Sequence, residues 1–433
     1  MSSKPHELAI DRLIDIVRKG GAIRTGVDVF NRDDVLLLEK NVLVKSVHQL
    51  LTIQEKGVGV VPINTKNEGG LWDHKGRSIL PEVSSPKPAV IPSVRERVAH
   101  ITHIKRDAAQ KYKEAKKNIK KVIDDIKQTG GEFDQKVMED TVTDLLEFIT
   151  RNDSAFFYLT REIFSYDDYL YHHSINVCTI GTAIMKKAVQ VFGDKIRPYS
   201  SQQLQDISTG FFLHDVGKVL LPDSTVNKPG PLTPEEFELV KGHSFKHGLE
   251  VLKKNSIHNR FIRDIVRYHH GPLFDGEDRC YPPVRSAVDL PPHVRISKLA
   301  DLYDAMTSKR CYKDAYNPVA VVTRIVRSYA GKEDSLQLLL HAFVKSIGIY
   351  PPGSVVHLLD KRLAYILDSE GPIVLPFTDA RGEPIPKQPD PIDLGDKDLI
   401  SAGLTVDNER PLVSPLDAYR MFPKYLKQPP AAA

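Results

Sequence analysis

"GFFLHDVGKVLLPDS" (residues 210–224) places a histidine, an aspartate and a lysine among aliphatic and aromatic residues. In a helix, Lys218 is the i+4 neighbour of His214 and the i+3 neighbour of Asp215, so the three side chains can converge before Pro222 limits the helix. Such a cluster in a core segment is either a purely structural polar cluster or a chemical site. Because an unpaired buried carboxylate is costly, the rest of the chain has to supply its partners.

Four further segments place histidine or aspartate where a helix normally buries an apolar residue. They contain His173 in "DDYLYHHSINVCTIG", His243 and His247 in "LTPEEFELVKGHSFKHG", His269 and His270 in "IVRYHHGPLFDG", and Asp301 and Asp304 in "VRISKLADLYDAMTSKRCYK". A single histidine on an apolar helix face is more often a hydrogen-bonded core residue than a ligand. Five segments of this kind in one helical region instead favour a metal site, because a bound metal would compensate the buried polar groups of all five segments.

Imidazole and carboxylate ligands suit borderline divalent metals such as iron, manganese, zinc or nickel. Five of these histidines and two of these aspartates are already more ligands than one tetrahedral site needs. The set fits two metal ions that share one bridging carboxylate.

Length, charge and cysteine content limit the class of protein. The chain has 433 residues, a formal net charge of +4 and three cysteines without CxxC spacing. The length fits two or three domains, the small charge does not indicate binding to a nucleic acid polymer, and the cysteines favour a reducing compartment. Neither a signal-peptide core nor an apolar run of about 20 residues is present, so we expect a cytoplasmic protein without a membrane span.

The patterns along the chain predict a mainly α protein with small β-containing parts at both ends. Residues 5–19 predict a helix, and short strands are expected near 27–30, 35–38 and 58–62. The predicted parts are a small α/β domain (1–63), a linker (64–94), a basic connecting helix (95–132), an all-helical domain (133–346), a β-rich extension (347–378) and an extended or partly disordered tail (379–433).

The basic helix could contact nucleic acid or an anionic membrane. An apolar stripe that includes Ile119, Val122 and Ile126 favours instead a connecting or dimerising helix with a solvated basic face. We therefore expect a homodimer or a signalling partner to use residues 95–128 or the N-terminal domain.

The order of these motifs over residues 160–346 resembles the HD-GYP branch of the HD superfamily, an all-helical fold of metal-dependent phosphohydrolases. It includes H-D-x-G-K, "LPDSTVNKPGPLTPEEF", H-H and "LADLYDAMTSKRCYK". Two strand-rich segments, "GVDVFNRDDVLLLEKNVLV" and "GIYPPGSVVHLLDKRLAYIL", also resemble segments that flank this domain. The resemblance implies hydrolysis of cyclic di-GMP to pGpG, and in some members to GMP.

The resemblance also implies roles for individual residues. Asp215 would bridge two divalent ions, iron or manganese in preference to zinc or nickel. The other ligands would be His173, His214 and Asp301 for one ion, and His243, His269 and His270 for the second. Tyr169 stands where some members have the glutamate that binds a third metal, so two ions are expected, and His247 is left as a structural or surface residue.

A hydroxide shared by two such ions would attack phosphorus, with Lys218 stabilising charge on the phosphate oxygens. The expected catalytic residues are therefore Asp215 and Lys218. Arg310 and Lys313 could hold phosphates or a guanine edge, and Tyr281 belongs to the loop that holds the substrate in the family. Asp304 would orient a ligand or water, or occupy a plain surface or capping position.

One loop departs from the family signature HHxxxDGxGYP. The chain reads "HHGPLFDGEDRCYPP" (residues 269–283), with Cys280 in place of a glycine and a longer loop around Asp275. This difference could alter the choice of ligand or slow turnover. The alternatives are therefore a cyclic GMP-AMP hydrolase, a non-catalytic receptor for a cyclic dinucleotide, and a different HD phosphohydrolase.

Overall fold

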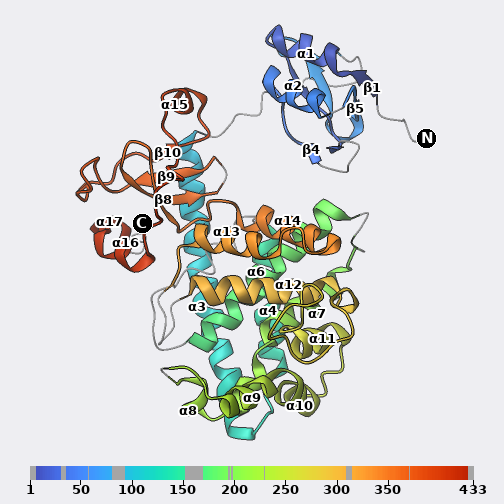
Figure 1. Cartoon of the computed structure of the whole chain (residues 1–433), viewed down its shortest axis with the longest axis vertical. Coiled ribbons are helices and arrows are strands. Elements are labelled where there is room, and N and C mark those ends of the chain that lie inside the picture. Colours follow the sequence, from blue (N-terminus) through green and yellow to red (C-terminus); the bar gives the residue numbers. More distant parts are fainter. Residues whose placement is uncertain are drawn as a thin grey trace. The chain divides into compact units, whose positions relative to one another are not determined.

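The computed structural model describes residues 6–30, 36–56, 58–79, 93–151, 169–193, 196, 198–228, 230–308, 315–369 and 371–427. The chain divides into two compact units, Met1–Pro92 and Ser93–Ala433. The protein is mainly helical, with small sheets in its N-terminal and C-terminal parts (Figure 1). In the part of the chain that the structure describes, no helix combines the length and apolar character needed to cross a membrane.

The N-terminal unit is a small α/β domain with one apolar core. Its helices are α1 (Ile10–Arg18) and α2 (Val47–Glu55), and its antiparallel strand pairs are β1 (His6–Ala9) with β5 (Val60–Ile63), β2 (Ala22–Arg24) with β6 (Gly70–Trp72), and β3 (Val29–Phe30) with β4 (Leu36–Leu38). Leu13, Ile23, Leu50 and Ile63 are fully buried in this core.

Two predictions for this unit are corrected by strand pairing. The helix predicted over 5–19 begins only at Ile10, because His6–Ala9 forms the backbone ladder with Val60–Ile63. The predicted linker from residue 64 contains β6, in which Trp72 is 4% exposed and pairs with Ala22. The segment up to residue 79 therefore belongs to the folded N-terminal unit.

The second unit begins with a 36-residue helix, α3 (Val94–Thr129). Ser93 and Glu96 form a capping box at its start, and Gly130 ends it in the left-handed conformation (φ +71°). The apolar stripe of α3, including Ile119, Val122 and Ile126, is buried against α4 (Gln135–Arg151) and α6 (Tyr169–Phe192). The basic helix is thus an integral layer of the second unit.

The helical core continues around α6, which packs against α7, α12 and α14. The further elements are α7 (Ser201–Leu213), η2 (Val216–Leu220), α8 (Asp223–Val226), α9 (Pro234–Gly242), η3 (His243–Gly248), α10 (Leu249–Lys254), α11 (Arg260–Tyr268), η4 (Ala287–Asp289), α12 (Pro292–Thr307), α13 (Pro318–Tyr329) and α14 (Asp334–Ile347). Residues 210–224, which contain His214, Asp215 and Lys218, therefore do not form one continuous helix. Helix α7 ends at Leu213, and the tighter 3₁₀ helix η2 follows Asp215.

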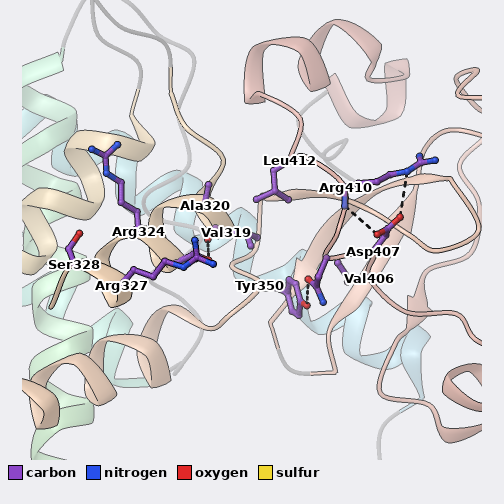
Figure 2. Close-up of a pocket in the computed structure, with 12 residues that line it drawn as sticks. Val319, Ala320, Arg324, Arg327, Ser328, Tyr350, Val406, Asp407, Arg410 and Leu412 are labelled. Atoms are coloured by element: carbon purple, nitrogen blue, oxygen red, sulfur yellow. Dashed lines mark hydrogen bonds and ion pairs between the residues drawn. The ribbon is translucent and has the colours of Figure 1, made fainter. Parts of the chain in front are cut away.

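A four-stranded antiparallel sheet follows the helices, in the order β10-β9-β8-β7. Its strands are β7 (Val355–His357), β8 (Leu363–Asp368), β9 (Ile373–Pro376) and β10 (Ile392–Asp393). Apolar side chains cover both faces, and Val319 of α13 belongs to the core on one of them. A pocket lies beside this junction of α13 with the C-terminal segments (Figure 2).

The predicted extended or partly disordered tail from residue 379 is wrong for the residues that the structure describes. Strand β10 joins the sheet, and the short helices α15 (Lys397–Ser401), α16 (Pro415–Met421) and α17 (Lys424–Lys427) follow. Leu394 and Val406 are buried on one face of the sheet and Ala418 on the other. These apolar residues have no helical or strand period, so their burial was not visible in the pattern.

Candidate metal centre

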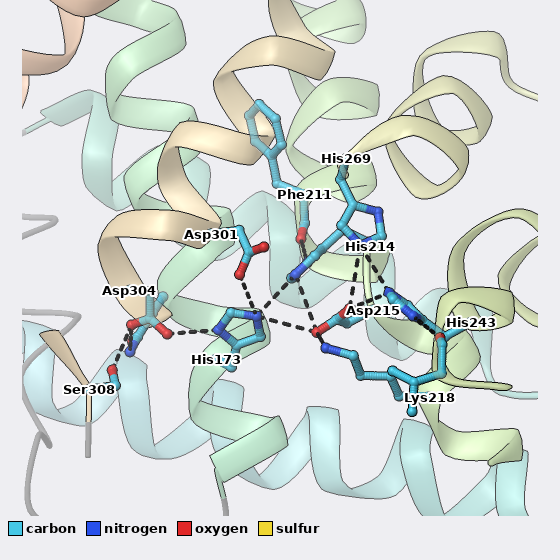
Figure 3. Close-up of polar contacts among 12 residues, drawn as sticks. His173, Phe211, His214, Asp215, Lys218, His243, His269, Asp301, Asp304 and Ser308 are labelled. Atoms are coloured by element: carbon cyan, nitrogen blue, oxygen red, sulfur yellow. Dashed lines mark hydrogen bonds and ion pairs between the residues drawn. The ribbon is translucent and has the colours of Figure 1, made fainter. Parts of the chain in front are cut away.

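Histidine and aspartate side chains from separate helices converge in the middle of the helical core. His173 comes from α6, and His214 and Asp215 follow directly after α7 (Figure 3). His243 opens η3 and His269 follows the last residue of α11. All five side chains are at most 1% exposed. The helix ends thus deliver polar groups into a core that is otherwise apolar.

Asp215 lies between two groups of histidines. Its Oδ2 atom is 3.3 Å from Nε2 of His173 and 3.5 Å from Nε2 of His214. Its Oδ1 atom is 3.1 Å from Nε2 of His243 and 3.5 Å from Nε2 of His269. Two sets of potential metal-binding atoms, each within 4.8 Å of one another, share this carboxylate: Asp215 with His243, His269 and His270, and Asp215 with His173 and His214.

Backbone carbonyls fix the tautomer of three histidines. The Nδ1 atoms of His214, His243 and His269 lie 2.8, 2.6 and 3.0 Å from the carbonyl oxygens of Phe211, Val240 and Val266. Because a carbonyl oxygen only accepts, each Nδ1 carries a hydrogen, and the Nε2 atom of the neutral ring presents its lone pair to the centre. This is the orientation that a metal ligand requires.

His173 is oriented by a carboxylate instead. Its Nδ1 atom donates to Oδ2 of Asp304 at 2.7 Å, while Asn176 and Ser308 donate to Oδ1 of Asp304 at 2.7 and 2.8 Å. Asp304 is 2% exposed, so the surface position considered for it is wrong. Asn176, one helical turn after His173, was not singled out from the sequence, although this spacing on α6 places both residues on one face.

The protonation states of His214, His243 and Asp215 favour the binding of a cation. Burial lowers the pKa of His214 to about 3 and also lowers the pKa of His243. Burial alone would raise the pKa of the Asp215 carboxyl, but the Lys218 ammonium and the neighbouring histidines hold it well below its usual range. Neutral imidazoles and a charged carboxylate are the protonation states that bind metal.

His173 behaves differently because carboxylates surround it. Burial opposes its charged form, but hydrogen bonds with Asp215, Asp301 and Asp304 outweigh burial and raise the pKa of His173 to about 10. A proton on Nε2 faces the oxygens of Asp215 and Asp301, where a metal ion would bind, while Nδ1 donates to Asp304.

Two contacts test whether the residues fit a metal. Nε2 of His214 is 3.1 Å from Nε2 of His173, and Nε2 of His243 is 3.1 Å from Nε2 of His269. Asp215 Oδ1 is buried and has no hydrogen-bond partner among the described residues. The lone pairs of His243 and His269 and the unpaired oxygen of Asp215 repel at this distance unless a cation lies between them, and the proton on His173 takes that place in the other group, so the residues fit a metal centre.

The remaining predicted site residues fall into three groups. Asp301 Oδ1 lies 3.3 Å from His173 Nε2, and Lys218 Nζ lies 2.5 Å from Asp215 Oδ2, with the lysine side chain 22% exposed. His247 is separate from the centre and lies 3.9 Å from Glu250. Arg310, Lys313 and the side chain of Tyr169 lie outside the described residues.

The loop that departs from the signature borders the centre. The ring of Tyr281 lies 4.6 Å from the ring of His270, and Phe237 meets it at 6.4 Å. Cys280 is half-buried, with its Sγ atom 3.3 Å from Lys298 Nζ. The cysteine therefore does not enter the metal-binding groups.

Lys298 of α12 anchors this loop and was not identified from the sequence. Its Nζ atom donates to the carbonyl of Gly271 at 2.9 Å and lies 2.9 Å from Glu277 Oε1. The hydroxyl of Tyr329 donates to the same Glu277 oxygen at 2.9 Å. In the sequence, the one hint to the role of Lys298 is its place three residues before Asp301 on the same helix. This spacing cannot reveal a contact with a loop that is distant in the sequence.

Comparisons with known proteins agree with this geometry. The sequence pattern of the HD domain family matches residues 136–333. The chain is 30% identical over 318 residues to the cyclic di-GMP phosphodiesterase PA4108 of Pseudomonas aeruginosa, covering 72% of this chain and 70% of that protein.

Other relatives match over shorter stretches. A 3'3'-cGAMP-specific phosphodiesterase 2 of Vibrio cholerae is 36% identical over 104 residues, which cover 24% of this chain and 19% of the relative. A cyclic di-GMP phosphodiesterase of Thermotoga maritima is 37% identical over 134 residues, covering 31% of this chain and 35% of the relative. With its HD domain, its long match to a cyclic di-GMP phosphodiesterase and its His/Asp centre, the chain belongs to the HD-GYP family of the HD superfamily.

Proposed function

We propose that this protein is a metal-dependent phosphodiesterase that hydrolyses cyclic di-GMP to the linear dinucleotide pGpG. The observation that carries the proposal is the position of Asp215, whose two carboxylate oxygens each face a different group of histidine Nε2 atoms. The long match to a cyclic di-GMP phosphodiesterase supports the substrate. A purely structural cluster would not need two groups of histidine Nε2 atoms directed at the two oxygens of one carboxylate.

The proposed centre holds two divalent ions. Oδ2 of Asp215 would serve one ion together with His173, His214 and Asp301, and Oδ1 would serve the other together with His243, His269 and His270. When bound, two such ions supply an acidified water and positive charge for the phosphate oxygens. The histidine-rich set suits iron, and manganese is the other expected metal, in preference to zinc or nickel.

The residues of the chain itself bind and orient the substrate. Lys218 has its ammonium next to Asp215, and its partial exposure lets the same group donate to a non-bridging phosphate oxygen. Tyr281 presents its ring beside His270, where it can border a guanine. Arg310 and Lys313 remain proposed contacts to phosphate or guanine because of their place after α12.

The substrate is tested by offering purified full-length protein cyclic di-GMP and 3'3'-cGAMP side by side. The assay is anaerobic, contains Fe²⁺ or Mn²⁺, and separates products by chromatography. We expect release of pGpG from cyclic di-GMP, and none from the Asp215→Asn variant. Faster turnover of 3'3'-cGAMP would assign the protein to the activity named for its Vibrio cholerae relative. Intact nucleotide that stays tightly bound after long incubation would make the protein a receptor.

Helix α3 is the proposed route for regulation or assembly. It follows the N-terminal unit directly, and its Tyr112 hydroxyl hydrogen-bonds to His172, the neighbour of His173. Arg97 of the same helix pairs with Asp368 and Asp393 of the C-terminal sheet. A partner that moves α3 would therefore also affect the position of His173 in the metal centre. Analytical ultracentrifugation distinguishes a homodimer from a monomer that awaits a signalling partner.

A further inference from the structure

A second pocket in the Ser93–Ala433 unit is separate from the metal centre. It has a volume of about 650 Å³ and lies between α13 and the segment around 406–412, beside Tyr350 (Figure 2). None of the proposed metal ligands lines it. Pockets of about 300–1,000 Å³ are of the size that holds small ligands.

The pocket has an excess of positive charge. Arg324 and Arg327 line it from α13 and Arg410 from the opposite side, while Asp407 is the single carboxylate among the described lining residues. Arg410 is occupied by Asp407, with Nε 3.5 Å from Oδ2. The described lining residues therefore carry a net charge of +2, from three arginines and one aspartate.

The two arginines of α13 are exposed, and no described carboxylate forms an ion pair with either of them. Among the described residues, no ion pair or hydrogen bond is found for the guanidinium of Arg324 or Arg327. They are three residues apart, and like charges at this spacing repel on a helix. The sequence of α13, "PVAVVTRIVRSY", contains no acidic residue to offset them. The helix dipole favours a cation in the last turn, where Arg327 lies, but does not account for the charged pair beside a pocket.

The opposite wall offers a fixed aromatic ring and apolar surface. The hydroxyl of Tyr350 donates to Oδ1 of Asn408 at 3.0 Å, which holds the ring in place. Val319 and Leu412 add apolar lining. In Figure 2 the side chain of Arg327 extends from α13 towards the Tyr350 side of the pocket. The pocket thus combines guanidinium groups for an anion with a ring and apolar atoms for an organic part.

We propose that this pocket binds a small phosphate-bearing ligand, with its phosphate on Arg327 and its organic part against Tyr350, while Arg324, whose side chain points away from Tyr350 in Figure 2, adds positive charge at the rim. Arginine is the side chain best suited to phosphate, because its planar fork can donate two parallel hydrogen bonds to phosphate oxygens. A nucleotide and inorganic pyrophosphate share this anion chemistry, and only the nucleotide also uses the ring.

A bound ligand would also stabilise the contact between α13 and the C-terminal part of the unit. Asn317 accepts from the first turn of α13 and donates to the carbonyls of Val355 and Val413 in the C-terminal part. Helix α13 packs in turn against α12, which carries Asp301. Occupancy of the pocket is therefore expected to raise the melting temperature of the unit.

Calorimetric titration of the full-length, metal-loaded protein tests the proposal with three probes: GMP, inorganic pyrophosphate and guanosine. We expect GMP and pyrophosphate to bind and guanosine to bind far more weakly, with binding weakened by salt. Arg327→Gln should weaken binding about tenfold, and Arg324→Gln should weaken it less. Arg381→Gln, an exposed arginine in a turn outside the pocket, should leave binding unchanged.

The comparison of probes and variants decides the outcome. Tighter binding of GMP than of pyrophosphate identifies a nucleotide as the ligand class, and the reverse identifies an inorganic polyphosphate. Both support a phosphate pocket. No binding of either probe at millimolar concentration, or binding that is unchanged in the Arg324→Gln/Arg327→Gln variant and so belongs to the metal centre, overturns the proposal. Hydrolysis without added ligand should be the same in these variants, which confirms that the metal centre is intact.

Discussion

Asp304 accepts a hydrogen bond from His173, with Oδ2 and Nδ1 2.7 Å apart in a fully buried contact. The bond fixes the His173 ring so that Nε2 points at Asp215 and Asp301. His214, His243 and His269 use backbone carbonyls for this purpose, so among these four histidines and the described residues around them Asp304 is the orienting group that a side-chain substitution can remove.

Replacing Asp304 with asparagine tests this orienting role. The amide can turn its NH₂ group towards Nδ1 and favour the wrong tautomer, and the negative charge is lost. We expect metal affinity to fall about 10–100-fold, as is typical when a partner of a ligating histidine is removed. Metal content after dialysis and the metal concentration that gives half-maximal activity measure the effect. Asp289→Asn, at an exposed carboxylate outside the centre, is the matched control, and equal metal affinity in both variants would refute the role.

Replacing Asp215 with asparagine should empty both halves of the centre. An amide offers one neutral oxygen, whereas the carboxylate offers one charged oxygen to each group of histidines. We expect bound metal to fall from two ions per chain to nearly none, measured by plasma mass spectrometry, with helical circular dichroism retained. His247→Gln changes a histidine outside the centre and should keep both ions. Loss of only one ion from Asp215→Asn would show that the carboxylate does not bridge.

Replacing Lys298 with methionine should loosen the loop that carries Tyr281. The carbonyl of Gly271 would lose this donor, and the Glu277 carboxylate would lose its cation while keeping the hydrogen bonds from Tyr329 and from the Leu273 amide. We expect a rise in KM with unchanged metal content, and a loss of about 1–3 kcal/mol in the free energy of unfolding.

Cys280→Ala is the control for this loop, because it removes only the weak contact of the thiol and leaves the bonds of Lys298 to Gly271 and Glu277. Its KM should be close to that of the original chain. A larger effect from Cys280→Ala than from Lys298→Met would show that the cysteine, and not the lysine, fixes the loop.

The lowered pKa of His293 should make the free energy of unfolding depend on pH. Burial lowers the pKa of His293 to about 4, with the nearby Arg260 a smaller cause, and neither ring nitrogen has a hydrogen-bond partner among the described residues. Because the unfolded chain binds a proton near pH 6.5, it holds more protons than the folded chain between pH 6.5 and 4. The free energy of unfolding therefore falls as the pH is lowered through this range, by about 3 kcal/mol.

His293→Phe should remove this part of the pH dependence, because a ring of similar size stays among Tyr199 and Phe261 without a titrating group. Urea denaturation at several pH values measures the difference between the two proteins. Parallel stability curves from pH 7 to 4 would contradict the assigned pKa.

The sequence was informative about the centre and much less so about what supports it. Residues such as His214 and Asp301 were conspicuous because polar groups interrupted apolar helix faces in a characteristic order. Asn176 and Lys298 act through contacts between elements far apart in the sequence, and no local period reports such contacts. The C-terminal tail was mispredicted for the same reason, since Leu394 and Ala418 are buried by the sheet and not by a periodic face of their own.

Anomalous diffraction from crystals of the full-length protein grown with Mn²⁺ tests the central claim most directly. We predict two peaks, one beside each oxygen of Asp215. The first should lie within bonding distance of His173, His214 and Asp301, and the second within bonding distance of His243, His269 and His270. A single peak that Asp215 does not contact, or no peak at either group of histidines, would contradict a two-metal centre built around this carboxylate.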